Sequence, residues 1–234
     1  MALIENTKGR RIGQSPSGYT RLFGVEALGH LMSQVQGTVI SAGTELEKLI
    51  WERVNRIEDL DKFITATIDD TIEVRREDKI YVASKQQIKK SLIVKSQYEP
   101  DFVAFNRHKL TSSVIEVKDG DQFDTKKSSG EHTTLENFTK DISQALPFSA
   151  RMYLCAFNCE TREEIYNGLK HKFPMKELLT GRELCNLLQI NYDEIREVRT
   201  KDQQGNLGYF VGELLKMNII WNMIEKQFVD KNQS

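Results

Sequence analysis

The sequence has little cysteine and little proline, and each shortage excludes a class of protein. Only three cysteines occur among 234 residues, namely Cys155, Cys159 and Cys185. They are too few for a disulfide framework, and one C-x-x-x-C spacing without a second pair is a weak zinc signal, so we expect ordinary buried thiols. With 4 Pro, 14 Gly and 39% hydrophobic residues, the composition is that of a globular protein with a real core rather than a collagenous or disordered one.

Long hydrophobic runs and an excess of charge of one sign are also missing. No stretch approaches the roughly 18 consecutive apolar residues that a membrane helix needs, and the opening MALIENTKGRR lacks the apolar core of a secretory signal. We therefore expect the protein to stay where it is made, in the cytoplasm. The 33 basic residues nearly balance the 34 acidic ones, so any surface for nucleic acid must be a local patch.

The length fits one α/β domain with additions, and we expect a single domain over residues 1–234. Residues 1–24 form an expected N-terminal arm without helical period, which carries Lys8, Arg10, Arg11 and Arg21 against Glu5. Such an arm is suited to follow a phosphate backbone, although a loose, solvated terminus is the common alternative.

Periodicity and turn signals predict the order of the elements. Helices are expected over 24–40 and after four T-x-x-E capping boxes, which begin at Thr44, Thr133, Thr161 and Thr180, and an apolar period runs over 209–228. Strands are expected at 65–69, 71–74, 79–83, 101–105, 113–117 and 152–157, and the polar tract 119–132 indicates a loop. This order predicts an α/β or α+β fold, in which helices flank a central mixed β-sheet.

The most informative stretch is Glu99-Pro100-Asp101, which is followed by Glu116-Val117-Lys118. Side chains alternate along a strand, so Glu116 and Lys118 should point to the same face. If Asp101 opens the neighbouring strand of a hairpin, its carboxylate comes close to that of Glu116. The sequence therefore predicts two acids and an amine on one surface.

Two carboxylates without a Cys or His ligand suit a hard cation, and magnesium prefers carboxylate, carbonyl and water oxygens. The backbone carbonyl of Val117, between the two side chains, is a natural third protein ligand. Lys118 can hold an attacking water while the cation polarises a phosphate, so the set predicts hydrolysis of a phosphodiester. The structural alternative is that E-x-K forms an ordinary solvent-facing pair on a sheet.

Together these residues resemble the motif of the PD-(D/E)XK nuclease superfamily. That core consists of a helix, a three-stranded antiparallel meander, a second helix and a further strand, and the expected elements match it over about residues 40–160. The segment GTELEKLI at 43–50 resembles the first core helix, where Glu47 matches an accessory carboxylate. Residues 161–234 are then a C-terminal helical region.

The resemblance implies a role for each residue of the motif. Asp101 and Glu116 would bind Mg²⁺, Val117 would add its carbonyl, Lys118 would position or activate the water, and Glu47 would assist. The tract KDGDQFDTKKSSGEH resembles those of type II restriction endonucleases, which implies a Mg²⁺-dependent enzyme that cleaves double-stranded DNA at a short sequence. It also implies a homodimer, because one site per chain cuts one strand, and a cognate DNA methyltransferase that acts on the same site.

Basic residues near the motif are the candidate DNA contacts. Seven Lys or Arg lie between Lys79 and Lys109, against two acids, and such a local excess favours phosphate docking. The candidates are Arg107, Lys109, Lys126, Lys127 and Ser128. A solvated charged face is the alternative for any one of these lysines.

Two other functions remain open on the sequence. A DNA repair or recombination nuclease of the same fold would recognise DNA shape and cut branched or mismatched duplexes selectively. A non-catalytic DNA-binding protein would bind in a salt-dependent way and never nick DNA with any divalent ion.

Overall fold

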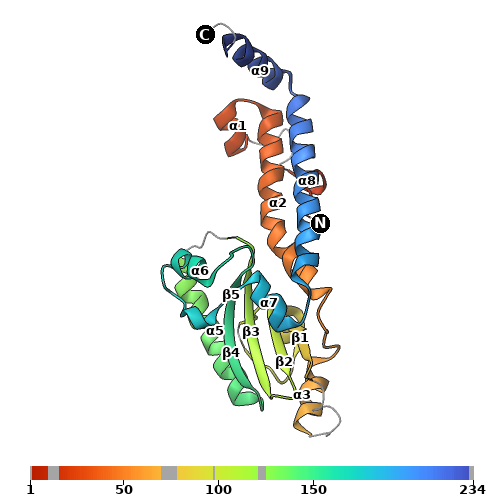
Figure 1. Cartoon of the computed structure of the whole chain (residues 1–234), viewed down its shortest axis with the longest axis vertical. Coiled ribbons are helices and arrows are strands. Elements are labelled where there is room, and N and C mark those ends of the chain that lie inside the picture. Colours follow the sequence, from red (N-terminus) through yellow and green to blue (C-terminus); the bar gives the residue numbers. More distant parts are fainter. Residues whose placement is uncertain (1, 10–15, 70–77, 97, 121–124, 232–234) are drawn as a thin grey trace. The chain divides into compact units, whose positions relative to one another are not determined.

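The computed structural model describes residues 2–9, 16–69, 78–96, 98–120 and 125–231, with only the backbone at 125–127 and 228–231. The chain forms two compact units (Figure 1). The sheet unit is Leu46–Tyr192, and the helical unit is Met1–Glu45 together with Asp193–Ser234. A single domain over 1–234 stays a prediction.

The sheet unit is built on five strands in the order β1-β2-β3-β4-β5. They are β1 (Ile80–Ser84), β2 (Phe102–Asn106), β3 (Thr111–Lys118), β4 (Ser149–Ala156) and β5 (Leu178–Thr180). The first three pair antiparallel, whereas β4 is parallel to β3 and to β5. The predicted mixed α/β sheet is thus confirmed.

Seven helices belong wholly or in part to this unit, within the described residues. They are the end of α2 (Glu26–Trp51), α3 (Leu60–Ile68), α4 (Lys85–Lys90), α5 (Thr125–Ala145), α6 (Arg162–Gly168), the 3₁₀ turn η2 (Met175–Glu177) and α7 (Gly181–Leu188). Leu135, Phe138 and Ile142 of α5 join one buried cluster with Val103 of β2 and Val114 of β3. Because side chains alternate along a strand, the face of β3 that presents Val114 also presents Glu116 and Lys118. Helix α5 therefore covers the face that carries the predicted motif.

Several predicted elements are confirmed. Strands 101–105, 113–117 and 152–157 correspond to β2, β3 and β4, and segment 79–83 corresponds to β1. The capping boxes at Thr161 and Thr180 open α6 and α7, with both reciprocal hydrogen bonds formed. The three cysteines are buried thiols, as expected.

Other predictions are wrong. Thr44 and Thr133 lie inside α2 and α5 and cap nothing, because each helix begins about two turns or more earlier in the chain. Segment 65–69 continues α3 instead of forming a strand, and the predicted loop 119–132 becomes helical from Thr125. Strand β5 was not foreseen. The predicted strand at 71–74 lies outside the described residues.

The helical unit contains η1 (Ile4–Asn6), α1 (Gly18–Phe23), most of α2, α8 (Tyr192–Leu215) and α9 (Asn218–Lys231). The predicted irregular arm is therefore wrong at 18–23, where Ser17 caps α1 and Gly24, at φ 67°, ends it. The periodic segment 209–228 is divided between α8 and α9.

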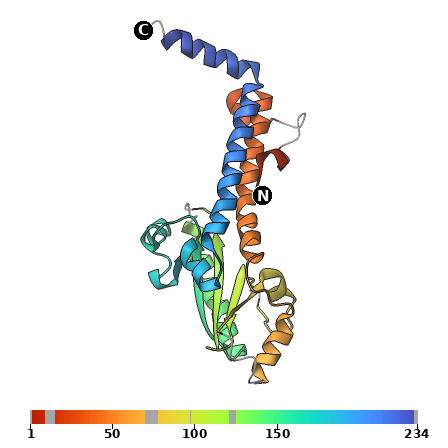
Figure 2. The ribbon, with the colours of Figure 1, turned by 45° about the vertical axis from the view of Figure 1, so that its right-hand side comes forward.

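Helices α2 and α8 run side by side (Figure 2), and the N-terminal segment links them. The Ile4 N–H donates to Asn206 Oδ1 at 2.8 Å, and Gln34 Nε2 donates to the Thr7 carbonyl at 3.0 Å. In the part of the chain that the structure describes, no helix is long and apolar enough to cross a membrane.

Candidate active site

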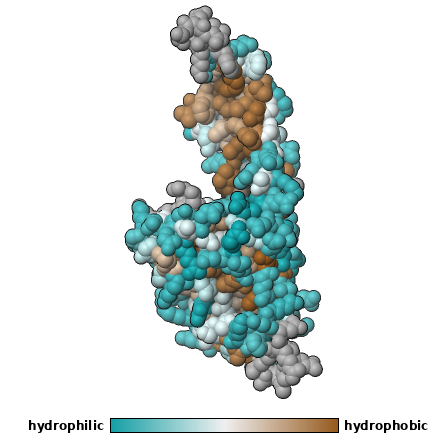
Figure 3. Space-filling model, viewed as in Figure 1, coloured by the Kyte–Doolittle hydropathy of each residue, from teal (hydrophilic) through white to brown (hydrophobic). Residues whose placement is uncertain are grey.

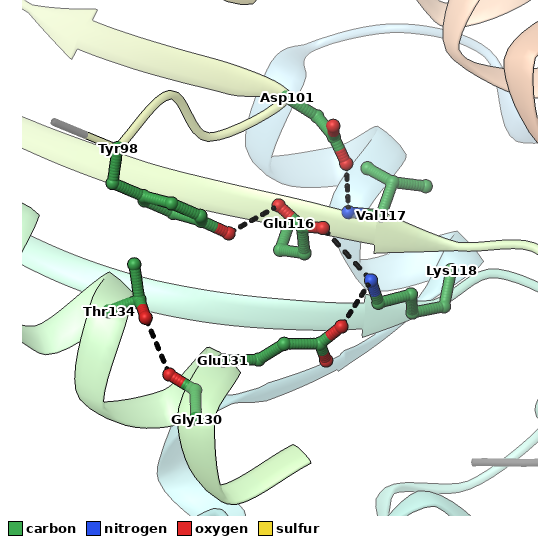
Figure 4. Close-up of polar contacts among 8 residues, drawn as sticks. All are labelled: Tyr98, Asp101, Glu116, Val117, Lys118, Gly130, Glu131 and Thr134. Carbon is green, nitrogen blue, oxygen red and sulfur yellow. Dashed lines mark hydrogen bonds and ion pairs between the residues drawn. The ribbon is translucent and has the colours of Figure 1, made fainter. Parts of the chain in front are cut away.

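The register of β2 and β3 brings the predicted acids together. Phe102 pairs with Ile115 across the antiparallel strands, so Asp101, one residue earlier, lies opposite Glu116. Opposite residues in such a pair point to the same face, with their Cβ atoms about 4.5–5.5 Å apart. Lys118 follows on that face at the end of β3, and Figure 4 shows the three side chains on adjoining chain segments.

Asp101 is almost completely buried, at 7% exposure. Its Oδ2 accepts a hydrogen bond of 2.9 Å from the Val117 backbone N–H. Burial first, and then repulsion from the carboxylates of Glu116 and Glu47, raises the pKa of Asp101 to about 7 against the lowering effect of that hydrogen bond. The folded protein therefore holds negative charge here that its own groups do not fully balance.

Glu116 and Lys118 belong to a chain of polar contacts (Figure 4). Glu116 Oε1 lies 2.9 Å from Lys118 Nζ, and Glu116 Oε2 accepts a 3.1 Å hydrogen bond from the Tyr98 hydroxyl. Glu131 of α5 contacts Lys118 Nζ from the other side, at 3.0 Å. The amine is thus held between two carboxylates.

The charge state of Lys118 follows from these contacts. Burial by itself lowers the pKa of Lys118, but the carboxylates of Glu116 and Glu131 outweigh it and raise the pKa above its ordinary value. The side chain is therefore a permanent cation at neutral pH, with donors and no proton to accept. It is suited to orient an oxygen atom and to stabilise negative charge.

Two further groups face this cluster from neighbouring helices. Burial, together with repulsion from Glu116, raises the pKa of Glu47 in the last turns of α2, although Lys85 and Lys118 oppose the rise. Lys85 begins α4, and its backbone N–H donates to the Asp101 carbonyl at 3.1 Å. Its charge also opposes the raised pKa of Asp101.

The residues present fit a hard divalent cation. Among the residues that the structure describes, no three His, Cys, Asp or Glu side chains form a metal cage by themselves, so a cation here would need backbone and water oxygens as well, as magnesium usually does. The donors at hand are carboxylate oxygens, and a cation removes the repulsion that raises the pKa of Asp101. The Val117 N–H points toward Asp101, and the N–H and C=O of one strand residue face the same side. The Val117 carbonyl therefore faces Asp101 too.

Tyr98 and Glu131 belong to the site but are not predicted from the sequence. Tyr98 precedes the motif in an irregular segment, where no period predicts its direction. Glu131 was assigned to a loop, and only the helical phase of α5 directs it toward Lys118. The one available signal was a tyrosine close to the Pro-Asp pair.

Two of the candidate DNA contacts, Arg107 and Lys109, lie away from the site. Arg107 and Lys109 follow the far end of β2, roughly 20 Å of strand from Asp101. The Arg107 guanidinium lies 3.6 Å from the centre of the Phe63 ring, and Lys109 Nζ lies 2.9 Å from Asp78 Oδ2. Ser128 is buried at the start of α5, while the side chains of Lys126 and Lys127 lie outside the described residues. Their contact with DNA stays a prediction.

Comparison with known proteins identifies the family. The chain is 40% identical over 232 residues to the type II restriction enzyme HhaII of Haemophilus parahaemolyticus, and the match covers 97% of this chain and 100% of that protein. This chain belongs to the family of type II restriction enzymes. The match covers nearly the whole chain, so family membership extends to the helical unit as well as to the sheet unit. No family model and no solved structure matches the chain.

Proposed function

We propose that this restriction enzyme is a magnesium-dependent PD-(D/E)XK endonuclease that hydrolyses phosphodiester bonds of double-stranded DNA at a short specific sequence. The observation that carries the proposal is the convergence of Asp101, Glu116 and Lys118 at the adjoining ends of β2 and β3. An acid pair can hold the cation of metal-assisted hydrolysis, and a fixed amine beside it can orient the attacking water. The family supplies the substrate class, since a restriction enzyme acts on DNA.

Each residue of the site then has a role. Asp101 and Glu116 bind the cation with the Val117 carbonyl, and Glu47 adds a carboxylate at its edge. A bound Mg²⁺ supplies charge that polarises the phosphate and stabilises the leaving oxygen. The buried position of Asp101 keeps competing water away from its carboxylate.

Lys118 orients the attacking water. Because Glu116 and Glu131 keep the amine protonated, it donates a hydrogen bond to the water oxygen and favours the hydroxide form by its charge. It does not accept the proton of the water, which must pass to solvent or to a phosphate oxygen. A fixed donor and charge of this kind lowers the barrier without any reorganisation during the reaction.

The proposed function brings two partners. A two-fold homodimer carries two sites and cuts both strands of a palindrome. A cognate DNA methyltransferase acts on the same sequence and protects the host DNA. For the protein in the cell we propose a cytoplasmic location, where that DNA lies.

Digestion of a mapped viral DNA with the purified protein tests the function. With Mg²⁺ we expect discrete bands, and with EDTA intact DNA. Asp101→Ala and Lys118→Ala should each lower the cleavage rate by about 10²- to 10³-fold or more. The matched control is Lys140→Ala, because Lys140 is an exposed amine on α5 that pairs with Glu136.

Two results would contradict the proposal. Undiminished cleavage by the Asp101→Ala or Lys118→Ala protein would overturn the assignment of residues. A smear, or cutting restricted to branched duplexes, would overturn sequence-specific cleavage and favour a nuclease that recognises DNA shape.

A further inference from the structure

The exposed hydrophobic side chains of the chain are concentrated in the helical unit. Of the large hydrophobic side chains that are exposed in the described residues, all belong to this unit except Ile68, Leu92 and Met175. Figure 3 shows the result as a hydrophobic area over the helices of this unit. The buried hydrophobic side chains of the unit, by contrast, are Ile4, Leu31 and Ile195 within the same described residues. Within the described residues, the unit therefore has more exposed large hydrophobic side chains than buried hydrophobic ones.

The apolar surface of α8 follows a helical stripe. Leu207, Val211 and Leu215 are 65%, 43% and 49% exposed, and their spacing of four residues places them on one face. Val39 and Ile40 of the neighbouring helix α2 are 68% and 72% exposed. A monomeric soluble protein rarely leaves a continuous apolar face of this kind in water.

Long stretches of the same helices contain no charged residue. Although 29% of the chain is charged, no Asp, Glu, Lys or Arg occurs in 27–44 of α2, in 203–212 of α8 or in 217–224 of the α9 region. A helix that only faces water normally carries charged residues on its outer face. Depletion of charge together with exposed apolar side chains is the composition of an interface core.

Four helical glycines of the unit differ in whether another segment lies close to them. A Cβ at Gly29 would come within 2.0 Å of Thr20, and one at Gly37 within 2.8 Å of Thr7, so the close approach of other segments accounts for both. A Cβ at Gly208 or Gly212 would meet nothing within 4 Å. These two, on the apolar stretch of α8, weaken the helix without serving a contact in the chain, and they leave room for a second backbone.

We infer that the helical unit is the dimer interface and that its partner is a second copy of this chain, which packs α8 and α2 against the same helices. Ten large hydrophobic side chains of the unit are exposed in the described residues, five of them on α2 and α8, and such side chains form the apolar core of a standard interface of about 800 Å² per partner. The absence of Asp, Glu, Lys and Arg from 27–44 of α2 and from 203–212 of α8 favours a like surface as partner over nucleic acid or a charged protein. The choice of a second copy also rests on the proposed function, which needs one site for each DNA strand.

Sedimentation of the full chain without DNA or metal tests the inference. We expect a dimer for the wild-type protein and for Leu92→Glu, the control at an exposed leucine of the sheet unit. Val211→Glu and Leu207→Glu should each raise the dissociation constant at least 100-fold, because a two-fold interface buries each new charge twice. A monomeric wild-type chain, or a dimer that both variants leave intact, would overturn the assignment.

Hydrogen exchange on the wild-type chain gives a second measurement that depends on no variant. Between dilute and concentrated protein, we expect added protection in peptides from 27–44 and 203–215. Added protection confined to 46–192 would overturn the inference. The two proposals fail separately. A dimer that never cuts DNA contradicts the proposed cleavage and not the interface, whereas a monomer that cuts DNA at a specific sequence contradicts the interface and the proposed homodimer but not the proposed cleavage.

Discussion

At the scale of single residues, the site combines a buried acid with a clamped amine. The neighbours of Asp101 do not fully balance a negative charge on its carboxyl group. Burial and the nearby carboxylates therefore raise the pKa of Asp101. Lys118 is held as a cation by carboxylates on two different elements. The first arrangement affects stability and the second affects the position of a reacting oxygen, so each has its own test.

The raised pKa of Asp101 predicts a pH-dependent loss of stability in metal-free protein. Below about pH 4 the carboxyl is protonated in both states and contributes nothing. Between the ordinary value of 3.8 and the folded value of about 7, only the unfolded chain releases the proton, so the free energy of unfolding falls as pH rises and levels off above 7. Asp101→Asn removes this effect, and should stabilise the protein at pH 8 by about 1 kcal/mol or more, roughly 2–4 °C in Tm.

Urea denaturation from pH 4 to pH 8 in EDTA measures the difference between the two proteins. The control is Asp59→Asn, since Asp59 is a half-exposed helix cap away from the site. A difference between Asp101→Asn and wild type that stays constant over this range would contradict a raised pKa.

We propose that Glu131, which contacts Lys118 Nζ at 3.0 Å, acts on the reaction through Lys118 as a positioning residue. Glu131→Gln keeps a hydrogen-bond acceptor but removes the charge that draws the amine away from Glu116. We expect the single-turnover cleavage rate to fall about 10-fold or more, with DNA binding unchanged, because a small displacement of a catalytic group is costly. Glu136→Gln, on the same helix but paired with Lys140, is the matched control. Equal rates for the two variants would show that Glu131 does not hold Lys118.

At the scale of elements, the four T-x-x-E sequences show when a capping box predicts the start of a helix and when it does not. At Thr161 and Thr180 the box opens a helix, because the preceding backbone is extended and leaves the first N–H groups without partners. At Thr44 and Thr133 the same letters lie inside a helix whose N–H groups are already bonded. Only the extent of the neighbouring helix separates the two cases.

This difference gives opposite effects for one substitution. Thr180→Ala removes a real cap of α7 and should lower the free energy of unfolding by about 1 kcal/mol. Thr44→Ala replaces an exposed helix-interior threonine, and should leave stability unchanged or raise it by up to about 0.5 kcal/mol. Chemical denaturation of both proteins decides this, and equal losses would contradict the assignment of Thr44 to the interior of α2.

The strands of the motif were predictable because β2 and β3 are bounded by clear turn signals and are largely buried. Segment 65–69 was not, since its β-branched residues favour a strand, whereas the packing of Phe63 and Ile64 in the core makes it the end of α3. The prediction of a loop at the start of α5 was wrong for a related reason. Its polar residues show no apolar stripe, and the contact between Glu131 and Lys118 exists only in the folded sheet unit.

At the scale of the whole molecule, the two compact units differ in the residues that they contain. The sheet unit contains the predicted acids and the amine, and the helical unit contains nearly all of the exposed apolar surface. The match with the restriction enzyme HhaII covers 97% of the chain, so the similarity includes both units. Because the sheet unit has its own core, we propose that it carries the nuclease site and that the helical unit serves for assembly.

The sequence by itself determined the spacing of Asp101, Glu116 and Lys118 along two successive strands. It also determined that Glu116 and Lys118 share one face, because side chains alternate along a strand. It further determined the absence of charge from 27–44 of α2 and from 203–212 of α8. Only the tertiary structure decided that Tyr98 and Glu131 complete the site, and that the apolar stripe of α8 is exposed while that of α5 is buried. Those outcomes depend on which distant segments meet, and no local pattern encodes such a meeting.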